Sequence, residues 1–288
     1  MKDEYVMGID NGGTVTKAAI YDRKGQVLAI ASKSTQMLTP REFHTERSID
    51  ELWAANVEVI KKAIEQSGID ASQIKGVAVT GHGNGLYLVD EEGHPVRNGI
   101  ISTDSRAKEY VERWQRSPEF LTDILPKTMQ SIWAGQPVAL LAWLKDFEPE
   151  TLQKARYIFM VKDLIRFYLT GEAFLELTDI SGTNLINVRD CKYDDELLAW
   201  WGLDELRDKL PPIKRSTECC GKITDDVARL TGLCAGTPVS GGVFDISASS
   251  IASGINGLDK MAIVTGTWSI NEYVTDHPVI DKDLFMTS

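Results

Sequence analysis

Cysteine and histidine are scarce in this sequence, and the few that occur are scattered. There are four of each among 288 residues, no two cysteines have the C-x-x-C spacing, and no histidine accompanies them at zinc-ligand spacing. The adjacent Cys219 and Cys220 are poorly disposed to bridge each other. The sequence therefore gives no sign of a zinc site or a disulfide scaffold, and we expect free thiols in a reducing cytoplasm.

Long apolar runs and a basic surface are lacking as well. No run is apolar enough to predict a membrane span, and the N-terminus has no basic segment followed by an apolar one, which a signal peptide requires. The formal net charge is −11, which disfavours a nucleic-acid or acidic-membrane partner because such partners need a basic face. With 43% hydrophobic residues, the chain can bury a substantial core in more than one domain.

A short apolar strand followed by a glycine-rich turn opens the chain. The segment from Met7 to Lys17 reads MGIDNGGTVTK, and its glycines let backbone N–H groups approach an anion without Cβ atoms in the way. Asp10 at the strand end is placed to hold Mg²⁺, directly or through water. The pattern predicts a phosphate-binding turn, with a β-hairpin and a solvated aspartate as the alternative. The predicted phosphate ligands are Asn11, Gly12, Gly13, Thr14 and Lys17.

A second turn of the same kind lies near the other end of the chain. Gly266-Thr267-Trp268-Ser269 repeats the G-T-x-[ST] pattern of the first turn, at a separation far too long for a solenoid repeat. The repeat indicates two related half-domains that each offer one turn to a shared phosphate. Gly266 and Thr267 are therefore also predicted phosphate ligands. Lys17, at the start of the second strand, is equally well explained as a surface cation.

This layout resembles the actin, hexokinase and Hsp70 ATPase superfamily, and within it the FGGY carbohydrate kinases. Further blocks that carry the resemblance are GIISTDSR at 99–106, LTDISGTNLIN at 177–187 and LTGLCAGTPVSGGVFDISA at 230–248. Within the family the chain is most similar to the pentulose kinases, and in detail to the L-xylulose kinases. The resemblance implies phosphorylation of a sugar hydroxyl with ATP and Mg²⁺.

The predicted fold is α/β, a ribonuclease H-like domain with a mixed sheet and helical insertions. Ser48 with Glu51 forms a capping box for the first helix, and Gly68 stands where its C-terminal glycine belongs. We expect residues 1–257 to form the N-terminal domain and 258–288 to begin a second, truncated one. Strands are predicted at 5–10, 17–22, 26–33, 74–80 and 238–242, and later helices at 107–115, 138–147 and 162–169.

The resemblance assigns the chemistry to two aspartates. Asp245 follows the Gly-Gly turn of the 230–248 block and is implied to be the base that accepts the proton of the attacking hydroxyl. Asp10 is implied to position Mg²⁺. Taken alone, Asp245 is also a good N-cap for a helix that begins at Ile246, and the two roles do not exclude each other.

Two loops are implied to meet the sugar. Xylulose kinases carry Met-His where this chain has Gly83-Asn84, and glycerol kinases carry Arg-Glu there. This difference in sequence argues against D-xylulose and glycerol as substrates. We expect the small Gly83 to admit another epimer or a longer sugar. His82 and Asn84 either contact the sugar or shape the loop, and Trp133 is a candidate to cover an apolar face of it. The predicted sugar contacts are His82, Gly83, Asn84, Asp104, Arg106, Trp133 and Asp245.

Other functions are weighed against this one. A dehalogenase-like phosphatase needs a second acid two residues after Asp10, and position 12 is glycine. A non-catalytic sugar sensor of the same superfamily stays open, as does a kinase for D-xylulose, ribulose or glycerol. FGGY kinases hold adenine in a glycine-rich pocket, and no such stretch follows Ser269. We therefore expect the 288 residues alone to lack kinase activity and the 261–274 hairpin to self-associate, with a homodimer as one outcome.

Overall fold

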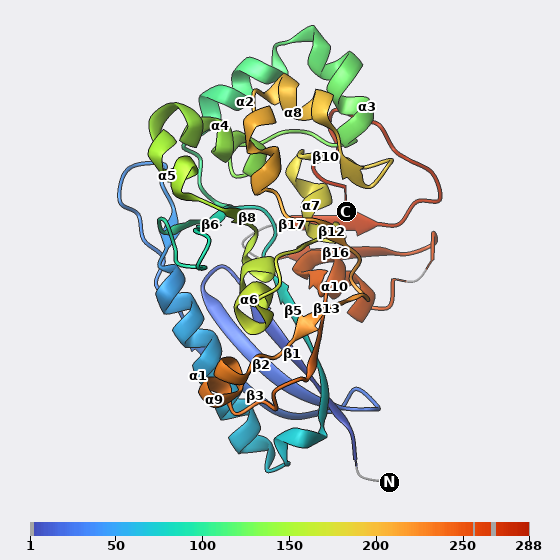
Figure 1. The fold of residues 1–288 in the computed structure, drawn as a ribbon. Coiled ribbons are helices and arrows are strands. Elements are labelled where there is room, and N and C mark those ends of the chain that lie inside the picture. The colour runs from blue at the N-terminus through green and yellow to red at the C-terminus, as the bar shows by residue number, and fades with distance from the viewer. Residues whose placement is uncertain (1–2, 256, 266–268, 288) are drawn as a thin grey trace.

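One mixed sheet runs through the lower half of the computed structural model, which describes residues 3–255, 257–265 and 269–287 (Figure 1). Its strands are β1 (Tyr5–Asn11), β2 (Val15–Asp22), β3 (Val27–Ser34), β5 (Ile74–Gly81), β13 (Cys219–Lys222), β14 (Pro238–Ser240) and β15 (Val243–Phe244). The order is β13-β14-β5-β1-β2-β3, with β15 pairing β5 after β14 ends. β1, β2 and β3 form an antiparallel meander, whereas β1, β14 and β15 all run parallel to β5.

Alternation of apolar residues builds the meander. Met7, Ile9 and Ile20 are buried on the face that α1 (Ile49–Ser67) covers, whereas Val6, next to Met7 in sequence, is half exposed. A period of two is the pattern of a strand with one buried face. The predicted strands at 5–10, 17–22, 26–33 and 74–80 are confirmed, with ends that differ by one or two residues.

The first helix is capped much as its sequence predicts. Ser48 Oγ accepts a hydrogen bond from the Glu51 N–H at 3.2 Å, and Gly68 ends the helix with φ +66°. The second half of the predicted capping box is wrong, because the Glu51 carboxylate accepts from the Gln36 N–H at 3.0 Å instead. Glu51 therefore ties the segment before the helix to its first turn.

Helices gather above the carboxyl ends of the strands in Figure 1. The three predicted helical segments correspond to α2 (Lys108–Gln115), α4 (Pro137–Phe147) and α6 (Val161–Thr170), and are confirmed. The remaining helices are α3 (Leu125–Thr128), α5 (Pro149–Lys154), α7 (Leu177–Ile180), α8 (Asp195–Trp201), α9 (Asp225–Thr231), α10 (Asp245–Ala252), a π-helical turn at Phe120–Ile124 and 3₁₀ turns at Ala71–Gln73, Ser181–Thr183 and Asp204–Lys209.

Short two-stranded pairings tie the helices to the sheet. They are β4 (Glu46–Arg47) with β7 (Gly99–Ile100), β6 (Tyr87–Val89) with β8 (Tyr157–Phe159), β9 (Leu175–Glu176) with β12 (Ile213–Lys214), and β10 (Ile186–Asn187) with β11 (Lys192–Tyr193). Within the described residues, no helix is both long and apolar enough to span a membrane.

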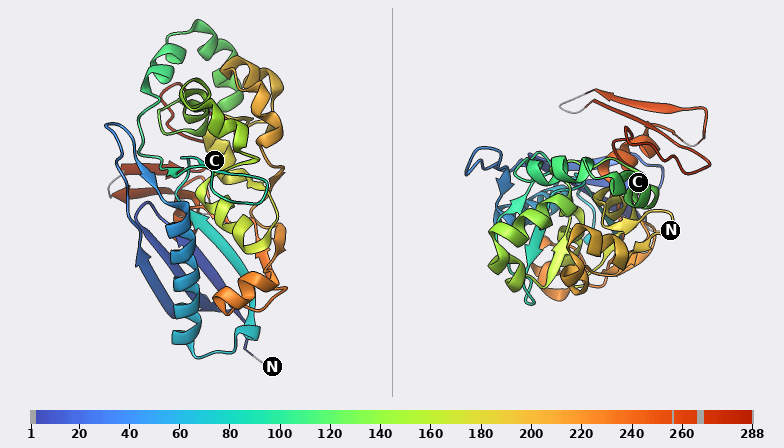
Figure 2. Two further views of the ribbon diagram at one scale, coloured as in Figure 1. Left: turned by 60° about the vertical axis from the view of Figure 1, so that its left-hand side comes forward. Right: turned by 90° about the horizontal axis from the view of Figure 1, so that it is seen from above.

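The last part of the chain leaves the main body and returns to it. β16 (Met261–Thr265) and β17 (Ser269–Tyr273) form a hairpin that, within the described residues, pairs only with itself, and the right-hand view of Figure 2 shows it standing out from the body. The chain then returns to the helical part, where the Ser131 N–H donates to the Leu284 carbonyl at 2.7 Å. The predicted domain boundary near residue 257 and the predicted self-association stay predictions.

A buried amide pair links the first strand to the first helix. The Asn56 amide nitrogen donates to Asn11 Oδ1 at 2.8 Å and to the Leu52 carbonyl at 2.8 Å, and the Asn11 amide nitrogen donates back at 3.2 Å. Neither asparagine is exposed. The pair fixes the end of β1 against α1 at the point where the glycine-rich turn begins.

We expect Asn56→Ala to lower the free energy of unfolding by about 1–3 kcal/mol, because it leaves the buried Asn11 amide without its partner. The measurement is the urea midpoint of the variant compared with that of the unaltered chain. Gln66→Ala is the control, since Gln66 lies exposed on the same helix. Equal midpoints for the two variants would contradict a stabilising role for the amide pair.

Candidate active site

The candidate site lies where three parallel strands end side by side. Asp10 of β1 pairs with Thr80 of β5, and Thr80 pairs with Val243 of β15. Neighbouring strands are ~4.8 Å apart, so the backbones of β1 and β15 are separated by about 10 Å. Asp10 and Asp245 thus flank the end of β5, and the carboxyl ends of parallel strands are where open α/β sheets bind ligands.

A buried arginine binds the glycine-rich turn from the inside of the protein. The Arg47 guanidinium donates to the Gly12 carbonyl at 3.2 Å and to the Gly13 carbonyl at 2.9 Å, and also to Thr35 Oγ1 at 2.6 Å. Its side chain is fully enclosed. Because these carbonyls point inward to Arg47, the outer side of the turn stays clear, and a Cβ added at Gly13 would meet no atom within 4 Å.

The predicted phosphate ligands differ in which of their hydrogen-bonding groups are free to bind a phosphate. The Asn11 side chain is committed to Asn56, and the Gly12 N–H donates to the Val15 carbonyl at 3.0 Å, so these two groups hold the turn and are not free donors. Thr14 is exposed. The phosphate contacts predicted for Asn11, Gly12, Gly13 and Thr14 stay predictions, and the Gly13–Thr14 part of the turn is the one left open to an anion. Gly266 and Thr267 lie outside the described residues.

Asp10 is an accessible carboxylate with a single ion-pair partner among the described residues. Lys17 Nζ lies 3.3 Å from Asp10 Oδ2, and about a third of the Asp10 side chain is exposed, 35%. An accessible carboxylate beside a turn with room for an anion fits the oxygen ligands that Mg²⁺ prefers. Lys17 is about half exposed and can reach either Asp10 or an anion at the turn, so both interpretations of Lys17 stay open.

Asp245 is presented by a sharp break in the chain. The predicted strand to residue 242 is wrong at its end, because β14 stops at Ser240 and Gly242 has φ +81°. A Cβ at Gly242 would lie 2.0 Å from the Val79 carbonyl oxygen, so only glycine fits. Phe244 is the N-cap and Asp245 is the first residue of α10. The alternative of Asp245 as the N-cap is therefore also wrong.

Burial raises the pKa of Asp245 to about 7, and the negative charge of Asp10 adds to this rise. A hydrogen bond from the Ile246 N–H opposes both. A carboxyl group with a pKa near neutrality exchanges its proton easily at physiological pH, which is what a general base needs.

His82 is committed to the protein on both ring nitrogens. Nδ1 lies 3.2 Å from the Gly83 carbonyl and Nε2 lies 2.9 Å from the Tyr87 hydroxyl. A carbonyl only accepts, so Nδ1 carries the proton and Nε2 accepts from Tyr87. Burial lowers the pKa of His82 to about 3, which keeps the ring neutral. Of the two interpretations of His82, the one in which it shapes the loop is favoured.

The space at Gly83 is filled by a neighbouring ring. A Cβ there would lie 2.2 Å from Cε2 of Phe244, so the expectation that Gly83 leaves room for a larger sugar is wrong. Asn84 is buried with φ +60°, and its Nδ2 lies 3.5 Å from the Met286 sulfur. The Asn84 Oδ1 atom has no hydrogen-bond partner among the described residues. Asn84 therefore keeps a free acceptor, as a sugar contact requires.

Asp104 and Arg106 bind each other. Arg106 Nε lies 3.0 Å from Asp104 Oδ1, and its Nη2 lies 2.9 Å from Oδ2 and 2.7 Å from Glu46 Oε1. The Thr45 N–H also donates to Asp104 at 2.6 Å, and neither side chain of the pair is exposed. The Asp104 carboxylate thus accepts its hydrogen bonds from inside the protein, whereas Arg106 Nη1 is buried without a hydrogen-bond partner among the described residues. The sugar contacts predicted for the two residues stay predictions.

Trp133 lies near the Gly83-Asn84 loop, since the Gly85 N–H donates to the Gly135 carbonyl at 3.0 Å. The ring of Phe285 stacks on Trp133, with centroids 5.4 Å apart. One aromatic face is thus already covered from within the chain, and the role of Trp133 toward a sugar stays a prediction.

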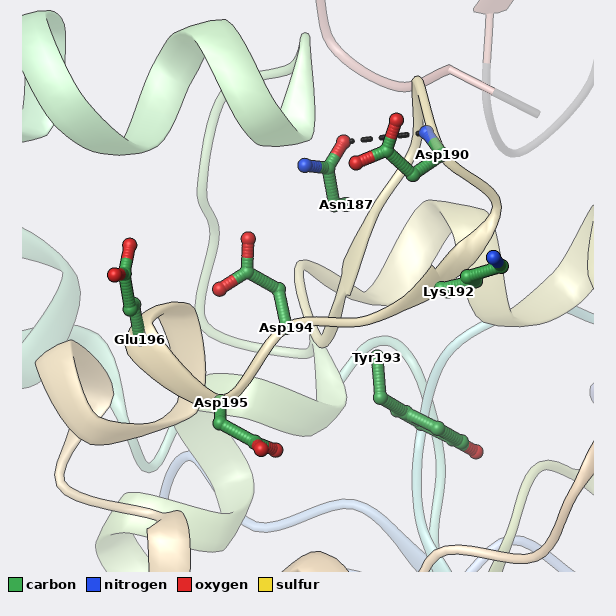
Figure 3. A pocket seen from close by; sticks show the side chains of 7 residues that line it. All are labelled: Asn187, Asp190, Lys192, Tyr193, Asp194, Asp195 and Glu196. Atoms are coloured by element: carbon green, nitrogen blue, oxygen red, sulfur yellow. Dashed lines mark hydrogen bonds between the residues drawn. The ribbon is translucent and has the colours of Figure 1, made fainter.

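An acidic hollow elsewhere is separate from this site. It has a volume of about 350 Å³ and lies at the β10–β11 turn and the start of α8, as Figure 3 shows. Its side chains point in different directions, and Lys127 already pairs with Asp194 at 2.8 Å. None of the predicted site residues belongs to it. The residues around it are Asn187, Asp190, Lys192, Tyr193, Asp194, Asp195 and Glu196.

Several residues that shape the site were not anticipated. Arg47 gave no signal because the glycine-rich turn that it holds lies at least 34 positions earlier in the chain. Lys162 and Arg166 did give a signal, since two cations and Asp163 in a helix whose other residues are mostly apolar indicate a buried charge cluster. Thr178 lies in a block that carried the resemblance, but no role was assigned to it.

Comparisons with known proteins agree with this geometry. The family described as "FGGY family of carbohydrate kinases, N-terminal domain" matches residues 5–252. The chain is 39% identical over 275 residues to a probable L-xylulose kinase of Pasteurella multocida, covering 95% of this chain and 56% of that protein. It is 39% identical over 274 residues to an L-xylulose/3-keto-L-gulonate kinase of Escherichia coli, covering 94% and 54%. The chain thus spans about half the length of the curated relatives it matches.

Solved structures show the same fold. A ligand-bound xylulose kinase from Lactobacillus acidophilus superimposes with a TM-score of 0.85 at 24% identity, covering 92% of this chain and 53% of that one. A gluconate kinase from the same organism gives 0.87 at 23% identity, covering 99% and 58%. The predicted actin- and hexokinase-like fold is thereby confirmed. The family match covers residues 5–252, and the strand order, the turn after β1 and the aspartate after the Gly-Gly break agree with it. The chain therefore belongs to the FGGY family of carbohydrate kinases.

Proposed function

We propose that this chain is the sugar-binding and catalytic part of an ATP-dependent sugar kinase in which Asp245 is the base. The observation that carries the proposal is the placement of Asp10 and Asp245 on either side of β5, with the pKa of Asp245 raised to about 7. The similarity to enzymes named as L-xylulose, xylulose and glycerol kinases supports it.

The chemistry follows from what the named groups can do. The Asp245 carboxylate takes the proton of a sugar hydroxyl while the hydroxyl oxygen forms a bond to the γ-phosphorus, and the bond from that phosphorus to ADP breaks. When bound, Mg²⁺ supplies positive charge that offsets the charge of the transferring phosphoryl group. Asp10 would hold the ion, directly or through water. The outer side of the turn at Gly13 and Thr14 would receive the phosphates.

The proposed substrate is a pentulose such as L-xylulose. The relatives named for L-xylulose are 38–39% identical to this chain, whereas those named as xylulose or glycerol kinases are 27–31% identical. Because Asp104 and His82 are hydrogen-bonded internally and the Arg106 side chain is enclosed, the sugar contacts we favour are Asp245, Asn84 and Trp133. The other candidates, D-xylulose, ribulose, glycerol and sugar binding without turnover, are outcomes of the test.

Asp245→Asn should lower kcat by at least ~10², because the amide cannot accept the hydroxyl proton, while the Kd for the sugar changes little. The kcat is measured in a polypeptide of the relatives' full length, and the Kd by calorimetry with L-xylulose. Asp225→Asn is the matched control, since Asp225 is likewise the first residue of a helix, α9, but is exposed and away from the site. A variant at 245 with near-normal kcat would remove that residue from the mechanism.

The pH dependence should follow the Asp245 carboxyl. A base acts only when unprotonated, so kcat/KM should rise with pH through about 7. In the chain itself, a ¹³C NMR titration should give the same value. Asp10→Asn should lower the pKa of Asp245 but leave it above the ordinary value of about 3.9, since burial is the larger cause. If Asp10→Asn has no more effect on this pKa than Asp225→Asn, the two aspartates do not interact.

A screen of pentuloses, hexuloses, polyols and glycerol tests the substrate. With ADP release as the signal, we expect the highest kcat/KM for L-xylulose or a close relative in the full-length polypeptide, and binding without turnover for the 288 residues alone. Glycerol or an aldohexose as the best substrate would contradict the pentulose assignment. Sugar binding with no turnover in the full-length polypeptide would support the sensor instead.

A further inference from the structure

Three polar contacts fix the short segment that presents Asp245. The Arg166 guanidinium donates to the Gly241 carbonyl at 2.8 Å, Thr80 Oγ1 donates to the Val243 carbonyl at 2.7 Å, and the Phe244 N–H donates to Thr178 Oγ1 at 3.0 Å. Gly242, between them, is wedged against the Val79 carbonyl. The contact made by Thr178 acts on the residue immediately before Asp245, so it bears most directly on where that carboxylate points.

The Thr178 hydroxyl is itself oriented by a buried acid. Thr178 Oγ1 donates to Glu176 Oε2 at 2.7 Å, which directs its lone pairs to the Phe244 N–H. Glu176 Oε1 in turn accepts from the Thr178 N–H at 3.0 Å and from Ser216 Oγ at 2.7 Å. A hydroxyl that donates to a carboxylate and accepts from an amide has no rotational freedom left.

Glu176 belongs to a fully buried cluster of charges. Lys162 Nζ lies 3.2 Å from Glu176 Oε2 and 2.9 Å from Asp163 Oδ1, and Arg166 lies 2.7 Å from Asp163 Oδ1. Burial raises the pKa of Asp179, the third acid, well above its ordinary value. Each oxygen of the Glu176 carboxylate has a cation or a hydrogen-bond donor beside it, which fixes the carboxylate in place.

We propose that Thr178 is a positioning residue for Asp245, and that it transmits the fixed geometry of the cluster of Lys162, Asp163, Arg166 and Glu176 to the turn that carries the base. The inference rests on the proposed function, because it assigns Thr178 a part in placing the candidate base. A misplacement of ~1 Å at a reacting group can cost about 10² in rate, so a single lost contact at this point should be visible in turnover.

The test compares Thr178→Val with Thr178→Ser. Valine matches threonine in shape but neither accepts from Phe244 nor donates to Glu176, whereas serine retains the hydroxyl. We expect Thr178→Val to lower kcat at least ~10-fold with KM for L-xylulose changed less than ~3-fold, and Thr178→Ser to stay within ~3-fold of the unaltered protein. Thr231→Val is the control, because Thr231 Oγ1 likewise donates at 2.7 Å, within α9, and is fully buried, but has no link to the turn.

Two measurements on the 288-residue chain need no turnover. In Thr178→Val the Phe244 amide should exchange its hydrogen at least ~10-fold faster, and the titration midpoint of Asp245 should move from about 7 toward its ordinary value as the turn opens to water. Neither should change in Thr231→Val. A protein that phosphorylates no sugar would refute the proposed function, yet these two readouts would still decide the role of Thr178.

The proposal is overturned by any of three results. Normal kcat in Thr178→Val would show that the contact does not position the base. An equal loss in Thr178→Ser would show that the hydroxyl is not what matters. An equal loss in Thr231→Val would show that turnover follows general stability instead of the geometry of this turn.

Discussion

The parallel register of β1, β5 and β15 is the constraint on which the candidate site depends. Asp10, Thr80 and Val243 lie in one row across these strands, and a slip of one residue in either ladder would turn the side chains to the opposite face. Glycine at 81 suits the close approach of β1 and α6 to the end of β5, since a Cβ there would lie 2.8 Å from Val161 Cγ1 and 3.1 Å from the Asn11 carbonyl oxygen. Backbone geometry, more than any side-chain contact, thus sets the separation of Asp10 and Asp245.

Buried cations hold the backbone next to both Asp10 and Asp245, but they differ in whether they are paired with carboxylates. Arg47 binds only carbonyl and hydroxyl oxygens, and among the described residues no carboxylate lies within ion-pair distance of it. Its charge therefore stays uncompensated at short range and favours an anion at the glycine-rich turn. Lys162 and Arg166 are instead paired with acids, and their cluster supplies rigidity to the Asp245 turn.

Local signals in the sequence were sufficient for most of the fold, and non-local contacts decided the rest. The meander, the first helix with Ser48 and Gly68, and the three later helices follow from periodicity and caps within about twenty residues. Asp104 and Arg106 form a short motif as well, but whether such a pair faces a ligand depends on Glu46, sixty positions away. The same is true of Gly83, whose empty space is filled by Phe244. A local pattern thus identified the loops of the site but not which of their side chains are still free.

Hydrogen bonds within the protein limit which side chains of the candidate site can contact a sugar. With the charged pair Asp104–Arg106 enclosed and His82 held neutral, the free acceptors we retain are Asp245 and Asn84 Oδ1. An unpaired buried acceptor costs about 1–3 kcal/mol, and a hydroxyl that donates to Asn84 recovers that cost. An epimer whose hydroxyl points away does not recover this cost, so the two epimers should differ roughly 5- to 150-fold in affinity. Under the proposed function, discrimination between pentuloses therefore depends on the neutral Asn84 amide oxygen and on the rigidity of the loop around it, in addition to the contact with Asp245.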